Sequence, residues 1–394
     1  MGTIIGTGAS SAPNTALAVQ EAVRTAQQGL GKQPALFGFL FSSPDRDLGT
    51  VLKVATEASG CNNLIGASTA GEFTERGLSH GGVVVMLVSG EGMTCRTALA
   101  KGLAEDYRKV AAELDKVVSG ARQVAASKDQ RRLTTVLLTD GLAGKGEELV
   151  LELHERVQAS QIVGGAAGDE GAFIETRVGC SAEAAASDAA VAAHIFSVHP
   201  WGVGIGHGLR PTTKPMRVSK AAGNVVQQVN NAPAFEIYKA HAAQRGVKLT
   251  PSTAGPYMIA NELGIHFFDK ISRARAPLSV GSDGSLTCAA AIPEGAMISI
   301  LDGEPDSMVS AATAAAEEAR EHLEGAKPAG VLLFDCVCRG MILKEDFPRE
   351  IAAVRKVFGD VPVAGFLTYG EIARYTGRLE GWHNTTAVVV AIPE

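Results

Sequence analysis

One pattern occurs three times along the chain and constrains its fold more than any other feature. Each copy has an apolar run, a helical segment, a second apolar run that leads to a glycine followed by an acidic residue, and a third apolar run. Short apolar runs between turn residues are typical of buried strands. The copies begin at 35–41, 135–139 and 331–334, and their glycine–acid pairs are Gly71-Glu72, Gly168-Asp169 and Gly370-Glu371. The sequence therefore predicts a strand–helix–strand–turn–strand module that is used three times.

The predicted fold class is α/β with mixed sheets, in two related domains built from this module. A chain of 394 residues is long enough for two or three domains that each bury a core. We expect residues 1–32 to form an N-terminal segment with one amphipathic helix, and the two domains to span 33–228 and 229–394. The boundary is placed after a predicted hairpin that turns at Gly223-Asn224.

Composition excludes several classes of protein. Apolar residues make up 46% and charged residues 20%, as in folded globular proteins. The net charge of -6 argues against a nucleic-acid partner, which requires a basic surface. No apolar run is long enough to span a membrane, and the N-terminus does not resemble a secretory signal. The six cysteines have neither disulfide-framework nor zinc-site spacing. We expect a cytoplasmic protein with free thiols and no bound metal.

The candidate site residues follow predicted strands. Ligands of open α/β sheets gather at the carboxyl ends of the strands. The residues at these ends are Ser42, Ser43, Thr69, Glu72, Asp140, Asp169, Cys336, Arg339, Tyr369 and Glu371. Arg339 would clamp a carboxylate, Glu371 would receive an ammonium or hydroxyl group, and Tyr369 would stack or donate a hydrogen bond. Such a set suits a small zwitterion or organic acid.

Other interpretations of these residues stay open. The glycine–acid pairs would serve only to turn the chain, and Arg339 would pair with Glu371. Cys336 follows an apolar strand, where a buried inert thiol is the commoner outcome. As a nucleophile it would need a lowered pKa. An enzyme acting on a small carboxylated substrate through Cys336, Glu371 or Asp140 is the corresponding alternative function.

Two features of the sequence bear on a possible cofactor. The glycine-rich run 141–146 lacks the residue order of a phosphate loop, so a glycine turn before a helix is expected there. A haem would need a well-placed axial ligand. His199 and His207, near Trp201, and His266, beside Phe267, are the histidines with suitable neighbours. An aromatic content of only 5% gives a large flat cofactor little support.

The order of several short motifs resembles the FIST N and FIST C domains over almost the whole chain. These motifs are 66–72, 200–202, 223–225, Pro233-Ala234 with Tyr238, 283–285, 292–295, Cys336 with Arg339, and 364–371. The resemblance implies a prokaryotic cytosolic sensory protein that binds a small ligand, amino acids being one proposal. Some relatives bind haem and respond to nitric oxide.

Members of the family that this chain resembles are often fused to kinase, cyclase or chemotaxis output domains, and we expect no such domain within these 394 residues. The resemblance therefore leads us to expect a sensor that acts through a separate signalling protein. The enzyme named above and a scaffold or homo-oligomer-forming module are the two other functions left open.

Overall fold

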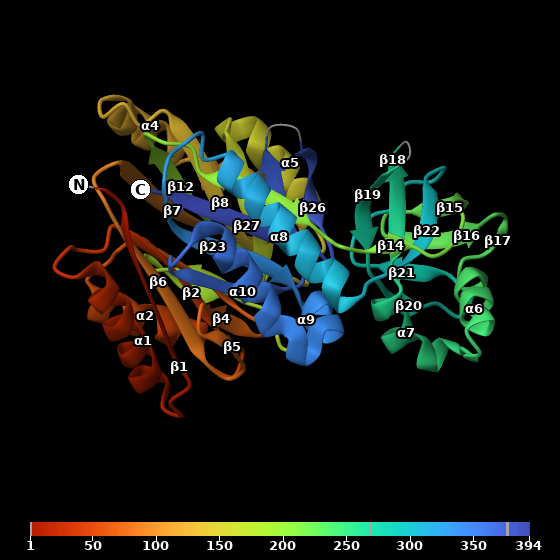
Figure 1. Ribbon diagram of the computed structural model, residues 1–394. Helices are drawn as coiled ribbons and strands as arrows, with labels where there is room; N and C mark the ends of the chain where they lie inside the picture. The colour runs from red at the N-terminus through yellow and green to blue at the C-terminus, as the bar shows by residue number, and fades with distance from the viewer. Residues whose placement is uncertain (1, 268–269, 376–377) are drawn as a thin grey trace.

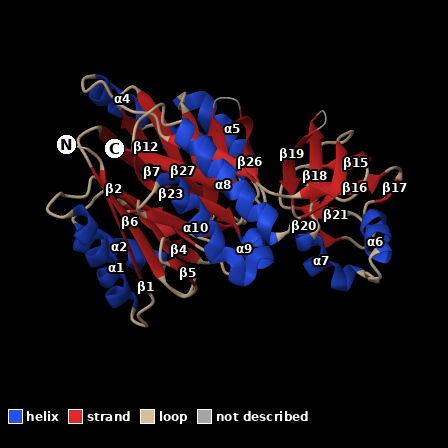
Figure 2. Ribbon diagram, in the orientation of Figure 1, coloured by secondary structure: helices blue, strands red, loops and turns tan. Residues whose placement is uncertain are grey.

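The computed structural model describes residues 2–267, 270–375 and 378–394, and it has two parts (Figure 1). Within the described residues, the larger part, here called the body, contains three six-stranded sheets and eight α-helices. The smaller part, here called the small domain, contains a nine-stranded sheet with helices α6 (Phe235–Gln244) and α7 (Ala254–Ala260). Strands dominate the centre of the body and helices its outside (Figure 2). The predicted α/β class with mixed sheets is confirmed.

The three sheets of the body combine strands that are far apart in the sequence. The first sheet has the order β1 (Ile4–Ser10), β6 (Val83–Ser89), β2 (Phe37–Ser42), β3 (Leu64–Ser68), β10 (Val178–Cys180), β11 (Glu183–Ala186). The second has the order β26 (Arg378–His383), β25 (Glu371–Tyr375), β9 (Gln161–Ala166), β8 (Arg132–Thr139), β12 (Ala189–Ser197), β7 (Met93–Lys101). The third has the order β13 (Gly202–Gly206), β27 (Ala387–Pro393), β23 (Pro328–Cys336), β24 (Val363–Thr368), β4 (Glu72–Thr74), β5 (Gly77–Ser79).

These sheets share one arrangement of strands. Each contains a parallel pair, β2 with β3, β8 with β9, or β23 with β24, and the first strand of each pair also has an antiparallel neighbour. Beyond the parallel pair, each sheet continues into a hairpin from another segment of the chain. The three parallel pairs therefore lie in separate sheets, each of which includes a hairpin from another segment of the chain.

Helices cover the outer faces of the sheets, while the inner faces share one apolar core. That core contains Phe41, Val136, Val163, Phe334 and Phe366, which come from all three sheets. The helices of the body are α1 (Thr15–Leu30), α2 (Leu48–Ser59), α3 (Tyr107–Asp115), α4 (Val118–Ala126), α5 (Gly146–Val157), α8 (Pro305–Glu321), α9 (Val337–Leu343) and α10 (Phe347–Phe358). No helix within the described residues is long and apolar enough to cross a membrane.

The small domain is inserted between β13 and α8, and it has a core of its own around Tyr238 and Ile300. Its strands are β14 (Arg210–Pro211), β15 (Met216–Ala222), β16 (Val225–Val229), β17 (Ala232–Pro233), β18 (Leu263–Phe267), β19 (Lys270–Arg275), β20 (Pro277–Val280), β21 (Leu286–Cys288) and β22 (Met297–Asp302), and its α-helices are α6 (Phe235–Gln244) and α7 (Ala254–Ala260). The predicted hairpin at Gly223-Asn224 joins β15 to β16. The predicted domain boundary at residue 228 falls inside β16.

Some elements differ from the sequence-based expectations. Residues 1–33 hold strand β1 as well as the expected helix α1. Glycines interrupt the apolar alternation of β1, so its strand pattern is hidden in the sequence. These glycines allow β1 to pack against α1, because an added Cβ at Gly6 or Gly8 would lie about 2 Å from a backbone oxygen of that helix. Cys336, which is expected at a strand end, is followed directly by the short helix α9.

Candidate functional site

A cavity of about 600 Å³ lies between the body and the small domain, within the size range of small-molecule sites. The body supplies the loop 140–146, the first turn of α5, the start of α9, Tyr369 and Trp382. The small domain supplies Arg273 of β19, Leu278 of β20 and the segment 289–293. Most of this lining is apolar, with a small number of charged and amide groups, as is typical of ligand pockets.

The glycine-rich run 141–146 forms one wall of the cavity and leads into α5, as predicted. A Cβ at Gly141 would lie 2.1 Å from the carbonyl oxygen of Ala167, so only glycine allows this close approach. At Gly146 a Cβ would lie 2.1 Å from the Trp382 ring. The first turn of α5 carries Glu147 and Glu148, which would repel a phosphate at this helix end.

The charged groups of the lining are nearly balanced by their neighbours. Glu147 accepts hydrogen bonds from Arg273, at 3.2 Å, and from the buried Arg275, at 3.3 Å. Lys145 donates to Glu148 at 3.1 Å. Among the residues that line the cavity, two have a buried polar atom without a hydrogen-bond partner among the described residues, namely Nε of Arg273 and Oδ1 of Asn384.

Asp140 lines the cavity, but its carboxylate oxygens bind the protein's own chain. Oδ1 accepts hydrogen bonds from the backbone N–H of Leu142, at 2.7 Å, and from the Thr176 hydroxyl, at 2.5 Å. Oδ2 accepts one from the backbone N–H of Asp188. Asp140 therefore fixes the loop of the cavity wall.

Tyr369 presents its ring to the cavity, and both its hydroxyl group and its ring contact other residues. Its hydroxyl donates to Asp169 and accepts from the N–H of Gly171 at 2.8 Å. Its ring stacks on Phe173, with centroids 4.6 Å apart and an interplanar angle of 16°. Burial and the hydrogen bond to Asp169 raise the pKa of Tyr369, so the phenol is neutral at physiological pH.

Cys336 lines the cavity, and Glu371, which does not, lies in a buried hydrogen-bond network next to it. Glu371 accepts hydrogen bonds from the Thr368 hydroxyl, at 2.5 Å, and from the N–H of Thr386, at 3.0 Å. Burial and the nearby Cys336 raise the pKa of Glu371. Burial also raises the pKa of Cys336, which favours the thiol over the nucleophilic thiolate.

Arg339 has no exposed surface and does not line the cavity. It forms ion pairs with Glu350, at 2.5 Å, and with Asp335, at 2.9 Å, rather than with Glu371. Its other N–H groups donate to the carbonyl oxygens of His207 and Met308. Those two residues lie where the chain leaves the body for the small domain and where it returns, so Arg339 holds both connections.

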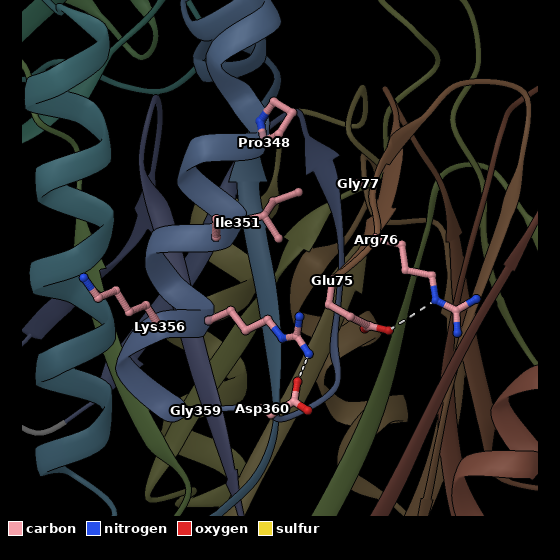
Figure 3. A pocket seen from close by; sticks show the side chains of 10 residues that line it. Glu75, Arg76, Gly77, Pro348, Ile351, Lys356, Gly359 and Asp360 are labelled. Atoms are coloured by element: carbon pink, nitrogen blue, oxygen red, sulfur yellow. Dashed lines mark hydrogen bonds and ion pairs between the residues drawn. The ribbon is translucent and has the colours of Figure 1, made fainter.

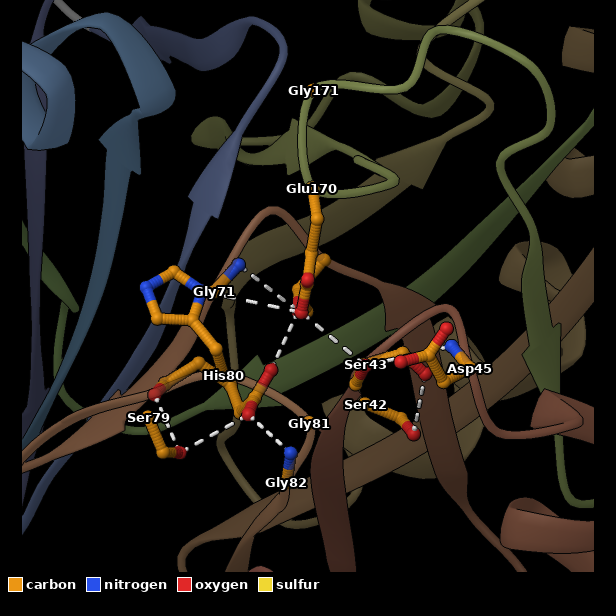
Figure 4. Close-up of polar contacts among 12 residues, drawn as sticks. Ser42, Ser43, Asp45, Gly71, Ser79, His80, Gly81, Gly82, Glu170 and Gly171 are labelled. Carbon is orange, nitrogen blue, oxygen red and sulfur yellow. Dashed lines mark hydrogen bonds and ion pairs between the residues drawn. The ribbon is translucent and has the colours of Figure 1, made fainter.

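Thr69 and Glu72 lie at a second strand end and do not line the cavity. Figure 4 shows polar contacts of this region, with Ser43, Ser79, Gly82 and Glu170 labelled. Glu72 is buried and accepts hydrogen bonds from Thr69 (2.7 Å), Ser79 (3.1 Å) and the N–H of Gly82 (2.8 Å). Burial raises the pKa of Glu72. Nearby, Glu170 accepts a hydrogen bond from Ser43 at 3.3 Å.

The three predicted glycine–acid turns meet inside the body through backbone hydrogen bonds. These bonds run from Ala70 N to Leu367 O (3.0 Å), from Gly168 N to Ser68 O (3.0 Å) and from Tyr369 N to Ala166 O (3.1 Å). Each turn therefore donates to the end of a strand in another sheet. At Gly370 a Cβ would lie 2.4 Å from the Trp382 ring, which explains why this turn needs glycine.

The histidines considered as haem ligands do not line the cavity. His266 forms a hydrogen bond with Ser299 at 2.8 Å, and Nδ1 of His207 accepts one from the N–H of Leu209 at 3.0 Å. His199 is exposed. Within the described residues, no group of three or more His, Cys, Asp or Glu side chains is arranged to hold a metal ion.

A second, more open groove of about 390 Å³ lies between α10 and the β4–β5 hairpin (Figure 3). Its charged side chains include two neighbouring ion pairs, Arg76 with Glu75 and Arg355 with Asp360. Three of these four side chains are at least one-third exposed, so solvent weakens any charge-based recognition there. The cavity between the body and the small domain is the better candidate site.

Sequence reasoning missed several residues of that cavity. Phe173, Arg273, Trp382 and Asn384 lie in segments without a recognisable motif. They meet at one place only because the exchanged hairpin β25–β26 and the inserted small domain bring them together. For Trp382 alone the sequence contains an indication of a special role, because it is one of only two tryptophans in the chain.

Comparisons with known proteins identify two sequence domains. The FIST N domain profile matches residues 36–232, and the FIST C domain profile matches residues 234–374. No curated protein matches the sequence.

Solved structures give only weak similarities. A cyanuric acid hydrolase from A. caulinodans has a TM-score of 0.28 and 9% identity, over 50% of this chain and 70% of that one. Phosphoribosylformylglycinamidine synthase II from Thermotoga maritima has a TM-score of 0.24 and 11% identity, over 99% and 72%. Scores this low do not establish a shared fold.

Proposed function

Because this chain belongs to the FIST family, whose domains are associated with small-ligand sensing in signalling proteins, we propose that it is a small-ligand sensor. Its binding site is the cavity between the body and the small domain. The observation that carries this proposal is that both parts supply the lining, so that a bound ligand contacts both. The ligand is a small organic acid or amino acid, and the signal passes to a separate protein.

The geometry favours binding over catalysis. Cys336 and Glu371 both have raised pKa values, which favour an unreactive thiol and a neutral carboxylic acid. The carboxylate of Asp140 is engaged by two backbone N–H groups and one hydroxyl. An activated nucleophile needs a lowered pKa or an adjacent base, and these side chains offer neither to a ligand in the cavity. The native protein should therefore return its ligand unchanged.

A thermal-unfolding screen against amino acids and organic acids tests this function. A ligand that binds only the folded state stabilises it by RT ln(1 + [L]/Kd), so Tm rises with the logarithm of the ligand concentration above Kd. Ala290→Trp places an indole in the cavity lining and should abolish the shift, whereas Ala58→Trp, on the exposed side of α2, should preserve it. An equal shift in both variants would place the ligand elsewhere. Mass spectrometry of the recovered compound would reveal turnover if the protein were an enzyme.

A further inference from the structure

The cavity gathers aromatic side chains in a chain that has few of them. Aromatic residues make up 5% of the sequence, yet Phe173, Tyr369 and Trp382 all line this one cavity. Aromatic rings add stacking energy to their apolar burial when they meet another flat ring. An aliphatic ligand would gain no ring-stacking energy from these three aromatic side chains.

The ring of Trp382 is held in place by two glycines. Cβ atoms would lie 2.1 Å from this ring at Gly146 and 2.4 Å from it at Gly370. Any larger residue at either position would displace the indole. The indole is 7% exposed, so it is fixed before a ligand arrives and contributes a preformed flat surface.

The Phe173–Tyr369 pair is also held rigidly. The carboxylate of Asp169 accepts hydrogen bonds from the N–H groups of Phe173, Ile174 and Glu175, in addition to that of the Tyr369 hydroxyl. These bonds stabilise a loop in which Phe173 has a φ of 53°, a conformation that non-glycine residues rarely adopt. Phe173 nevertheless stays 50% exposed. An exposed ring held in a strained loop at the cavity wall is suited to stacking on a ligand.

A cationic side chain of the lining indicates the rest of the ligand. Arg273 lines the cavity, and one nitrogen of its guanidinium group, Nη1, donates to Glu147 at 3.2 Å. A guanidinium group has several N–H donors, so Arg273 can bind a second acidic oxygen besides that of Glu147. Such a charge-assisted hydrogen bond to an acid is strong.

We propose that the cavity binds a small acid that carries a flat aromatic ring. This assignment deepens the proposed function and depends on it, because it names the ligand class of the same cavity. The rings of Phe173, Tyr369 and Trp382 select the flat part of the ligand. Arg273 selects its acidic group.

Isothermal titration with matched probes tests the ligand class. Phenylacetate and cyclohexylacetate share their carbon skeleton and charge but differ in the flatness of the ring, and phenylacetamide keeps the ring without the charge. We expect phenylacetate to bind about tenfold more tightly than either analogue. Phe173→Leu should lower phenylacetate affinity about threefold to tenfold and leave cyclohexylacetate unchanged. The control is Ile174→Ala, because Ile174 is 83% exposed and does not line the cavity.

The possible failures are distinguishable. Equal affinities for phenylacetate and cyclohexylacetate would overturn the aromatic preference and leave the sensor function standing. If only aliphatic compounds stabilise the protein in the thermal screen, the aromatic preference is also wrong and the sensor function still stands. If no acid of either kind binds, and no compound stabilises the protein, both the ligand class and the proposed function are wrong.

Discussion

At the scale of single residues, Glu262 places a carboxyl group in a fully buried position between the two parts of the molecule. It lies between α7 and β18 of the small domain and accepts hydrogen bonds from Thr385 and Cys338 of the body. Its Oε2 atom has no partner among the described residues. Burial raises the pKa of Glu262 to about 7, from an ordinary value of 4.5.

This raised pKa predicts a pH dependence of stability. Between pH 4.5 and 7 the folded protein keeps a proton that the unfolded chain releases, so this group destabilises the fold as pH rises through that window. Glu262→Gln removes the titration. The free energy of unfolding of this variant, relative to that of the native protein, should rise by about 3 kcal/mol between pH 4.5 and pH 8. Urea unfolding at both pH values measures the gain, and a constant difference between the two proteins would refute the raised pKa.

The sequence identifies which residues follow the predicted strands, but it does not identify the groups that these residues contact in the fold. Tyr369, Cys336 and Asp140 line the cavity, as a strand-end site would require. Arg339 is instead surrounded by Glu350, Asp335 and two carbonyl groups. Asp335 is only four residues before Arg339, but local sequence could not reveal the other partners, because Glu350 lies on the next helix and the carbonyl groups are 31 and 132 residues away.

At the scale of elements, two glycine-rich strands lie directly against alanine-rich helices. Added Cβ atoms at Gly202, Gly204 and Gly206 of β13 would lie 1.8, 2.0 and 2.4 Å from backbone oxygens of α8. Strand β1 approaches α1 in the same way. The glycines therefore allow helix and strand to pack closely, and the small side chains leave no room for an added methyl group.

Two Gly→Ala substitutions should have opposite effects. Gly204→Ala forces a methyl group into the backbone of α8 and should lower the free energy of unfolding by about 1–3 kcal/mol. Gly120→Ala lies on exposed α4, where an added Cβ meets nothing within 4 Å, and should raise it by about 0.5–1 kcal/mol. Chemical denaturation of the two variants measures both values. A neutral Gly204→Ala would contradict the close contact between β13 and α8.

Local periodicity predicted most helices and the strands of the three parallel pairs, because the apolar spacing of a helix or strand is visible within a short stretch of sequence. It could not predict that β4–β5, β10–β11 and β25–β26 leave their neighbours and join other sheets. Those pairings depend on packing between segments as far apart as residues 72 and 366. Strand β1 was missed for a local reason, since its glycines interrupt the apolar alternation.

At the scale of the whole molecule, the cavity and the connections between the two parts share one short helix. The start of α9 supplies Val337 and Cys338 to the cavity lining. The next residue, Arg339, holds the carbonyl groups of His207 and Met308 at the two connections. A ligand in the cavity therefore contacts the helix that fixes the small domain to the body, which is the arrangement that a sensor needs.

Native mass spectrometry of the purified protein with the acid panel tests the cavity most directly. We predict a one-to-one complex whose small molecule is released unchanged on denaturation. The complex should be retained by Ala58→Trp and lost in Ala290→Trp. An equally occupied complex in Ala290→Trp, or the absence of any complex in the native protein, would contradict the claim that this cavity is the binding site of a small-ligand sensor.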